Sequence, residues 1–140
     1  MDLLARREHS RFELQRKLSA RAYTDEQIAT TLDQLEQAGL LSSTRFAESF
    51  IRGRIARGHG PRRIRKELAE RGIDEAQGRN LLGQVPVDWD AEARKVRAKR
   101  FGAQAPKNYK ERARQARFLD YRGFEREQIN AALDLGAVSD

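Results

Sequence analysis

The stretch from Glu67 to Leu82, ELAERGIDEAQGRNLL, decides the fold, because the chain contains its pattern three times. The other two copies are KLSARAYTDEQIATTL at 17–32 and FLDYRGFEREQINAAL at 118–133. Each copy has a leucine followed three positions later by an arginine, and the leucines are 50 and 51 residues apart: Leu18, Leu68 and Leu119. Repeats of this length are typical of stacked helical modules.

The turn inside each copy is the next shared feature. Gly72 and Gly123 follow the arginine in the second and third copies, where glycine favours the left-handed conformation that ends a helix. The first copy has Ala22 at this position. Because a side chain is strained there, we expect the first turn to differ slightly from the other two.

Helical periodicity and capping signals extend along the whole chain. Ser10 with Glu13 and Thr24 with Gln27 have the spacing of a capping box, and Pro61 suits the first turn of a helix. These signals predict helices at about 10–21, 25–38, 43–56, 61–71, after Asp74, from Asp88 or Asp90 to Arg100, 108–122 and 125–135. The sequence therefore predicts an all-α protein of about eight helices in tandem three-helix repeats, with units at 1–50 and 51–105 and an incomplete third unit at 106–140.

Composition indicates an elongated chain of small modules and excludes several kinds of site. Charged residues make up 35% and hydrophobic residues 39%, which is little apolar material for one large core. The chain has no cysteine, which excludes disulfides, zinc-thiolate sites and thiol nucleophiles. No apolar run is long enough to cross a bilayer and the first residues lack a secretory core, so we expect a cytoplasmic protein.

The positive charge is concentrated after residue 50. The whole chain carries +7, while residues 1–50 hold seven basic and eight acidic residues. This asymmetry indicates an anionic partner for the later part of the chain.

The stretch 51–68, IRGRIARGHGPRRIRKEL, contains the first group of candidate contacts to DNA or an acidic protein surface. These candidates are Arg52, Arg54, Arg57, Arg62, Arg65 and Lys66. An ordinary solvated helix surface is the alternative, since Arg63 and Lys66 each have a glutamate four residues later. The five arginines among the candidates have no such local acid.

A second basic stretch, 94–114, contains the remaining candidates: Arg94, Lys95, Arg97, Lys99, Arg100, Lys107, Lys110, Arg112 and Arg114. Trp89, Phe101 and Tyr109 lie among them, and aromatic rings can stack on unpaired bases. We expect Trp89 and Phe101 to pack between helices instead. Tyr109 is open to either role.

The sequence gives no support for catalysis or for a metal or cofactor site. His9 and His59 are the only histidines, and neither has the histidine partner of a helical zinc site four residues away. We expect both to be exposed or capping side chains. The chain has no nucleophile paired with a base, and we expect a protein that is not an enzyme and needs no cofactor.

With the three-helix repeat, the segments FIRGRIARGHGPRRIRKELAERGI, DWDAEARKVRAKRFG and RFLDYRGFEREQI resemble the bacterial RecX family. The likeness runs from about Arg6 to Leu135. It implies an elongated, curved array that binds the RecA filament on single-stranded DNA and modulates it, mainly by inhibiting ATP hydrolysis, strand exchange and co-protease activity. Recombination, DNA repair and the SOS response would be regulated in this way.

The resemblance also implies a RecA filament and single-stranded DNA as partners, with duplex DNA as a further candidate, and we expect a monomer. The chain begins almost directly at the first expected helix, so we expect any N-terminal extension to be short or missing. The alternative function is that of a stand-alone nucleic-acid-binding protein that coats DNA without a recombinase partner.

Overall fold

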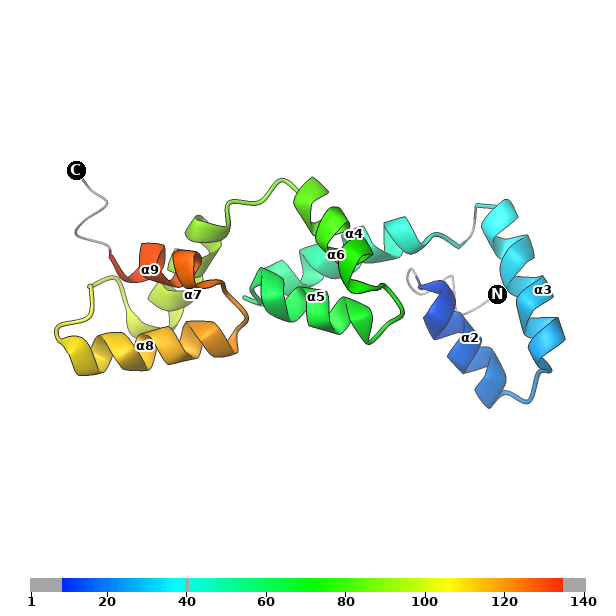
Figure 1. Cartoon of the computed structure of the whole chain (residues 1–140), viewed down its shortest axis with the longest axis horizontal. Helices are drawn as coiled ribbons and strands as arrows, with labels where there is room; N and C mark the ends of the chain where they lie inside the picture. The colour runs from blue at the N-terminus through cyan, green and yellow to red at the C-terminus, as the bar shows by residue number, and fades with distance from the viewer. Residues whose placement is uncertain (1–8, 40, 135–140) are drawn as a thin grey trace.

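The computed structural model describes residues 9–39 and 41–134, and these residues form eight helices and no strand. The helices are α2 (Arg11–Ala20), α3 (Asp25–Gln37), α4 (Ser43–Ala56), α5 (Pro61–Ala69), α6 (Glu75–Gln84), α7 (Trp89–Phe101), α8 (Tyr109–Tyr121) and α9 (Arg126–Leu133). They follow one another in groups along an elongated molecule (Figure 1). The predicted all-α class and helix number are confirmed for the described residues.

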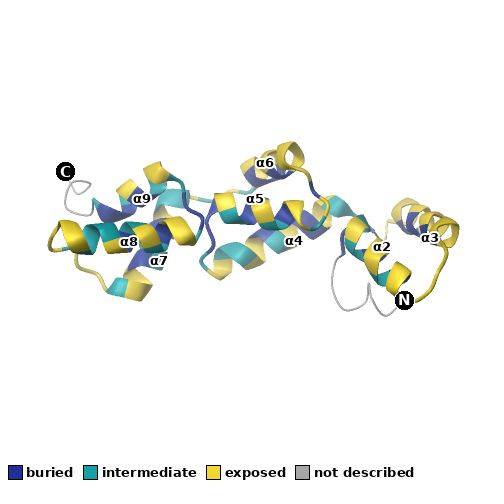
Figure 2. Ribbon diagram, turned by 60° about the horizontal axis from the view of Figure 1, so that its bottom comes forward, coloured by how far each residue is buried: buried dark blue, intermediate teal, exposed yellow. Residues whose placement is uncertain are grey.

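Three separate hydrophobic cores divide the helices into units. The first core lies between α2 and α3, the second within α4–α6 and the third within α7–α9, and buried residues lie on the inner faces of each group (Figure 2). The expected unit boundary at 50/51 falls inside α4, which is one continuous helix. The boundary at 105/106 falls between α7 and α8, although both helices pack on the same core. The last unit thus has three helices, because Ala93 of α7 is buried with α8 and α9.

Local capping chemistry sets the helix starts. Ser10 and Thr24 form the predicted capping boxes with Glu13 and Gln27. Pro61 occupies the first turn of α5 as predicted. Asp74 and Asp88 accept hydrogen bonds from backbone N–H groups at the start of the helices that follow them.

All three repeat turns are left-handed, and the turn at Ala22 differs from the other two only slightly, as expected. Ala22 has a φ of 66°, beside 87° at Gly72 and 96° at Gly123. In each copy the N–H after this residue bonds to the carbonyl of the repeat leucine, as Tyr23 does to Leu18 at 3.4 Å. Alanine thus adopts the left-handed conformation at this exposed position despite its Cβ.

One type of junction joins the units twice. The hydroxyl of Ser10, the N-cap of α2, donates to the carbonyl of Arg71 at 3.1 Å. The backbone N–H of Gly60, the N-cap of α5, donates to the carbonyl of Arg122 at 2.7 Å. Arg71 and Arg122 are the equivalent arginines of successive repeats. The starts of α2 and α5 therefore each rest on the repeat turn of the next unit.

The second junction is reinforced by apolar packing. Trp89 packs against both the second and the third core, and its ring lies 6.5 Å from that of Phe124. Phe101 packs edge-on to Phe118 with ring centroids 5.4 Å apart. The predicted packing roles of Trp89 and Phe101 are confirmed. The second and third units are therefore joined by side chains from both cores.

Candidate polyanion-binding cleft

A cleft of about 370 Å³ lies at the junction of the second and third units. The end of α4, one side of α7 and the end of α8 form its walls. Its lining residues are Ile55, Ala56, Arg57, Gly58, Glu92, Lys95, Val96, Lys99, Arg100, Phe118 and Arg122. We call it the cationic cleft, because five of these side chains are cations and Glu92 is the one carboxylate.

The cations reach the cleft from three helices, α4, α7 and α8. Lys95 and Lys99 are four residues apart on α7 and therefore share one face of that helix. Arg57 is the C-cap of α4, and Arg100 lies in the last turn of α7. Glu92 lies 3.7 Å from the ammonium group of Lys95, which is highly exposed, so this pair adds little stability. The cleft keeps a large excess of positive charge.

Phe118 holds two of the guanidinium groups in place. The guanidinium carbons of Arg100 and Arg122 lie 5.2 and 5.1 Å from the centroid of its ring. Arg122 also donates to the carbonyl of Arg57 at 3.0 Å, which ties the two units together. Guanidinium groups fixed over an apolar wall can bind phosphates while the wall contacts sugar or base. The arrangement fits a phosphate backbone and offers no reacting group.

Sequence reasoning identified four of the five cleft cations, namely Arg57, Lys95, Lys99 and Arg100. It missed Arg122, which it treated only as a repeat position. The sequence shows that Arg122 directly precedes the turn glycine. It does not show that Arg122 contacts the end of α4, because that contact depends on how the two units pack. The other predicted candidates lie elsewhere.

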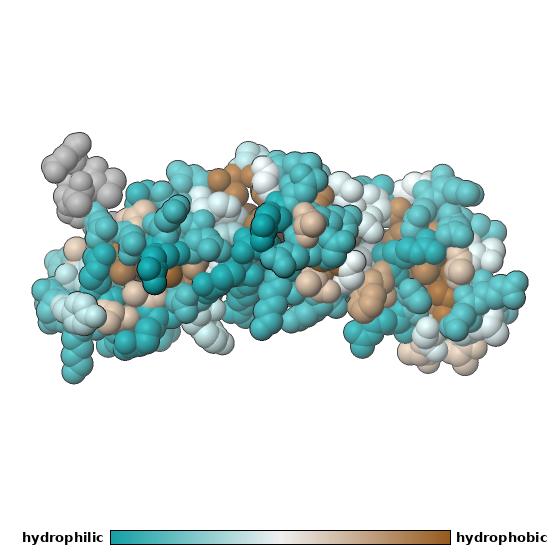
Figure 3. All heavy atoms as spheres, viewed as in Figure 1, coloured by the Kyte–Doolittle hydropathy of each residue, from teal (hydrophilic) through white to brown (hydrophobic). Residues whose placement is uncertain are grey.

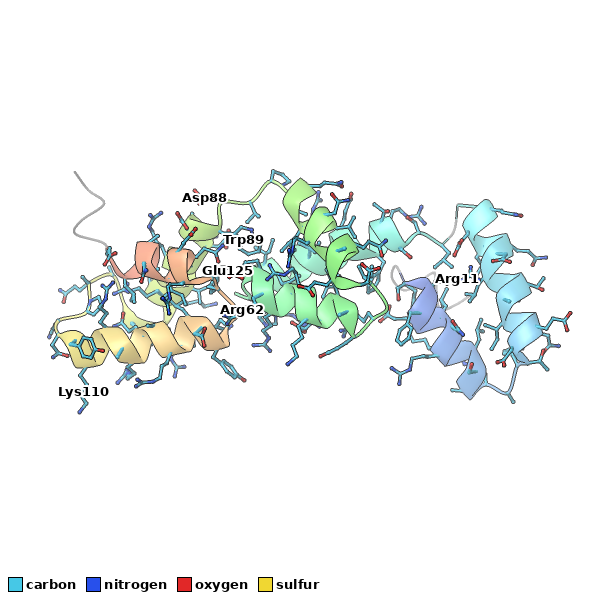
Figure 4. All side chains as sticks on the ribbon, in the orientation of Figure 1. Arg11, Arg62, Asp88, Trp89, Lys110 and Glu125 are labelled. Atoms are coloured by element: carbon cyan, nitrogen blue, oxygen red, sulfur yellow. The ribbon has the colours of Figure 1, made fainter. Side chains whose placement is uncertain are left out.

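Three predicted arginines are engaged in ion pairs with acids that are distant in the sequence. Arg54 lies 3.3 Å from Glu67 within the second unit. Arg62 pairs with Asp120 at 3.0 Å, and Arg65 with Glu125 at 3.3 Å. Figure 4 shows Arg62 and Glu125 at the border between α5 and the third unit. The lack of an acid four residues away therefore did not predict which arginines are unpaired, because the fold brings distant acids beside them. Arg63 does pair with Glu67 at 3.5 Å, as the alternative reading expected.

Arg97 has a structural role and is removed from the candidate binding surface. Its side chain is 1% exposed, and it donates to the side chain of Gln115 at 3.0 Å and to the carbonyl of Gly102 at 3.0 Å. It also donates to the carbonyl of Gln104. Burial lowers the pKa of its guanidinium group. Arg97 thus fixes the loop between α7 and α8, and a buried side chain cannot contact a polyanion.

The remaining candidates are dispersed. Arg112 pairs with Asp134 at 2.8 Å, and Arg114 lies 5.4 Å from the ring of Phe101. Arg94 is half-buried, whereas four others are exposed: Arg52, Lys66, Lys107 and Lys110. Lys110 points away from the ribbon at the outer end of α8 (Figure 4). Tyr109 beside it is 85% exposed. Hydrophilic side chains cover most of the face in Figure 3, so exposed charge alone does not mark a site.

Both histidines are buried, which corrects the expectation that they are exposed or capping. The Nε2 of His9 lies 2.9 Å from the ammonium group of Lys17. The Nδ1 of His59 lies 3.2 Å from Glu67 Oε1, and burial lowers the pKa of this imidazole. Over residues 9–39 and 41–134 no group of three potential metal ligands occurs. Within the same residues, no helix has the length and apolar character to span a membrane.

Sequence models of three RecX domains match the chain in order. The first three-helix domain matches residues 1–35, the second matches residues 44–79 and the third matches residues 88–133. The second and third of these ranges fall within the units defined by the α4–α6 and α7–α9 cores.

Curated relatives carry the description "Regulatory protein RecX". The protein of Pseudomonas entomophila is 50% identical over 133 residues, which cover 95% of this chain and 86% of the relative. That of Halorhodospira halophila is 47% identical over 130 residues, covering 93% and 81%. The crystal structure of RecX from Lactobacillus salivarius superposes with a TM-score of 0.79 at 21% identity, over 96% of this chain and 91% of that one. This last likeness concerns the fold.

Proposed function

The chain belongs to the RecX family of regulatory proteins, and from that premise we propose that it binds the RecA filament on single-stranded DNA and regulates it. The regulation would be mainly inhibitory and would act on ATP hydrolysis, strand exchange and co-protease activity. The protein would work in the cytoplasm as a monomer and thereby influence recombination, DNA repair and the SOS response. The family is regulatory and non-enzymatic.

The proposal rests on one observation: the three units form an elongated array, and a cationic cleft lies at one of the junctions between them. An elongated array can contact several neighbouring subunits of a filament at once. Holding those subunits in one arrangement opposes the conformational cycling that hydrolysis and strand exchange require. The cationic cleft would hold the phosphate backbone beside them.

The experiment is a titration of this protein into RecA that is hydrolysing ATP on single-stranded DNA at physiological salt. Inhibition at one copy per many RecA protomers supports filament regulation. Inhibition that requires enough protein to cover the DNA, and that added DNA relieves, contradicts the proposal.

A second candidate function, that of a stand-alone nucleic-acid-binding protein, is favoured by the cationic cleft itself. Five cations against one carboxylate would bind a strand without any recombinase. Such a protein would act only by covering DNA. The same titration separates the two functions, because stoichiometric coverage is needed in one case and not in the other.

A further inference from the structure

Two further clefts are related to each other by the sequence repeat. The first, of about 480 Å³, is lined by Phe12, Glu13, Arg16, Lys17, Ala20, Glu70 and Arg71. The second, of about 590 Å³, is lined by Arg62, Arg63, Lys66, Glu67, Glu70, Asp120, Tyr121 and Gly123. The five α2 residues of the first cleft correspond to the five α5 positions of the second, 50 residues later. We call these two the junction clefts.

Each junction cleft is built in the same way. One wall is the outer face of α2 or α5, and the other is the repeat turn of the next unit. Each also contains an exposed aromatic ring near an arginine, but the rings lie on opposite walls, since Phe12 belongs to α2 and Tyr121 to α8 of the next unit. Arg16 lies 5.8 Å from the ring of Phe12, which is 40% exposed, and Arg63 lies 5.6 Å from that of Tyr121, which is 75% exposed.

A row of exposed cations runs along the same helices. Arg16 on α2, Lys66 on α5 and Arg117 on α8 occupy equivalent repeat positions, 50 and 51 residues apart, and all three are exposed. We call them the cation row. Figure 1 shows α8 and α5 following each other along the lower side of the molecule, with α2 beyond them. The molecule therefore presents one cation per unit at a repeated place.

The junction clefts differ from the cationic cleft in charge. Glu13 and Glu70 lie in the first junction cleft, and Glu67, Glu70 and Asp120 lie in the second. Carboxylates repel phosphates, so these clefts suit a nucleic-acid backbone poorly. Exposed aromatic rings and arginines are instead enriched at protein interfaces. The cationic cleft shares no lining residue with either junction cleft.

We propose that the face formed by α2, α5 and α8 docks on a row of identical protein subunits, each of which presents a carboxylate to one member of the cation row. A surface that repeats an exposed cation at the same place in each unit is complementary to a partner that repeats one acidic side chain. This inference rests on the proposed function, in which the subunits are successive RecA protomers. It assigns the cation row to protein and the cationic cleft to DNA.

The test compares the binding of full-length variants to RecA filaments on single-stranded DNA and to that DNA alone. The variants are Arg16→Glu, Lys66→Glu and Arg117→Glu, singly and together, with the triple glutamine variant as a milder change. Arg79→Glu is the matched control, since this exposed α6 cation lies outside the cation row and lines neither the junction clefts nor the cationic cleft. Far-UV circular dichroism checks that every variant keeps its helices.

Each reversal should weaken filament binding about fivefold, and the triple variant should weaken it on the order of 100-fold, since the three contacts act together. The triple glutamine variant should lie between the wild type and the triple glutamate variant. Affinity for DNA alone should fall by a much smaller factor than affinity for the filament, and both affinities of Arg79→Glu should change less than about twofold.

A triple variant that binds the filament as tightly as the wild type overturns the inference alone. So does one that loses affinity for DNA and filament equally, because the row would then contact nucleic acid. If the wild type itself binds the filament no better than DNA, the proposed function is refuted and this inference with it.

Discussion

Gly123→Ala should disrupt the junction between the second and third units. Gly123 has a φ of 96°, and a Cβ at this position would lie 2.6 Å from the backbone nitrogen of Arg63. Because the obstacle is backbone, no side-chain rotation can relieve it. The two junction hydrogen bonds nearby, from Gly60 N–H to the Arg122 carbonyl at 2.7 Å and from Arg62 N–H to the Gly123 carbonyl at 2.9 Å, would be strained or lost.

The magnitude follows from these two effects. The left-handed conformation costs alanine about 1 kcal/mol, and two lost hydrogen bonds cost about 1 kcal/mol each. Gly123→Ala should therefore lower the free energy of unfolding by about 3 kcal/mol. The first repeat turn supplies the control, because Ala22 is an exposed alanine in the same conformation. Ala22→Gly should change the free energy of unfolding by no more than about 1 kcal/mol.

The assay is urea unfolding followed by far-UV circular dichroism and by fluorescence. Trp89 is the only tryptophan in the chain and lies at this junction, so its emission reports the junction directly. A Gly123→Ala protein whose stability falls by less than about 1 kcal/mol would refute the reasoning, since the strain of the turn alone would account for it.

Three further predictions concern buried and cationic side chains. Arg97→Leu should lower the free energy of unfolding, measured in urea, by about 3 kcal/mol, because the Gln115 side chain and two loop carbonyls lose their donor. The affinity of this variant for DNA should change less than about twofold. The lowered pKa of buried His59 means that the unfolded chain binds more protons between the folded pKa and about 6.5. Stability should therefore fall as pH drops through this window, and His59→Gln should make the pH dependence of the unfolding free energy shallower; equal slopes would contradict this. If the five cations of the cationic cleft neutralise five phosphates, the logarithm of single-strand affinity should fall with that of salt concentration with a slope of about −3.5, and Arg57→Ala with Lys99→Ala should reduce the slope by about 1.4. If fluorescence-anisotropy titrations give the double variant the same slope as the wild type, Arg57 and Lys99 do not contact phosphate.

The helices were predictable because their signals are local. The capping boxes at Ser10 and Thr24, the N-cap at Asp88 and Pro61 in a first turn act within four residues of each other. The predicted helix at 43–56 agrees with α4 at both ends. The preference for glycine in a left-handed turn did not hold at Ala22, where alanine adopts that conformation.

The candidate site was only partly predictable because charge in a sequence does not say where a side chain will lie. Arg97 and Lys99 are two residues apart in one basic stretch, yet one is buried and the other is exposed in the cationic cleft. Helical geometry places them on different faces, but only the packing of α7 reveals which face is covered. For the same reason the acids that pair with Arg62 and Arg65 were not visible, since they lie 58 and 60 residues away.

The sequence by itself determined the helical class, the repeat and the excess of positive charge after residue 50, because each depends on residue type and spacing alone. Tertiary structure decided how the units join and which cations remain free. Contacts between separate helices bury His9 and His59 and pair Arg54 with Glu67. They also place Arg57 and Lys99 in the same cleft. Such contacts form through packing of complete units, and their free energies are not encoded in any one stretch of chain.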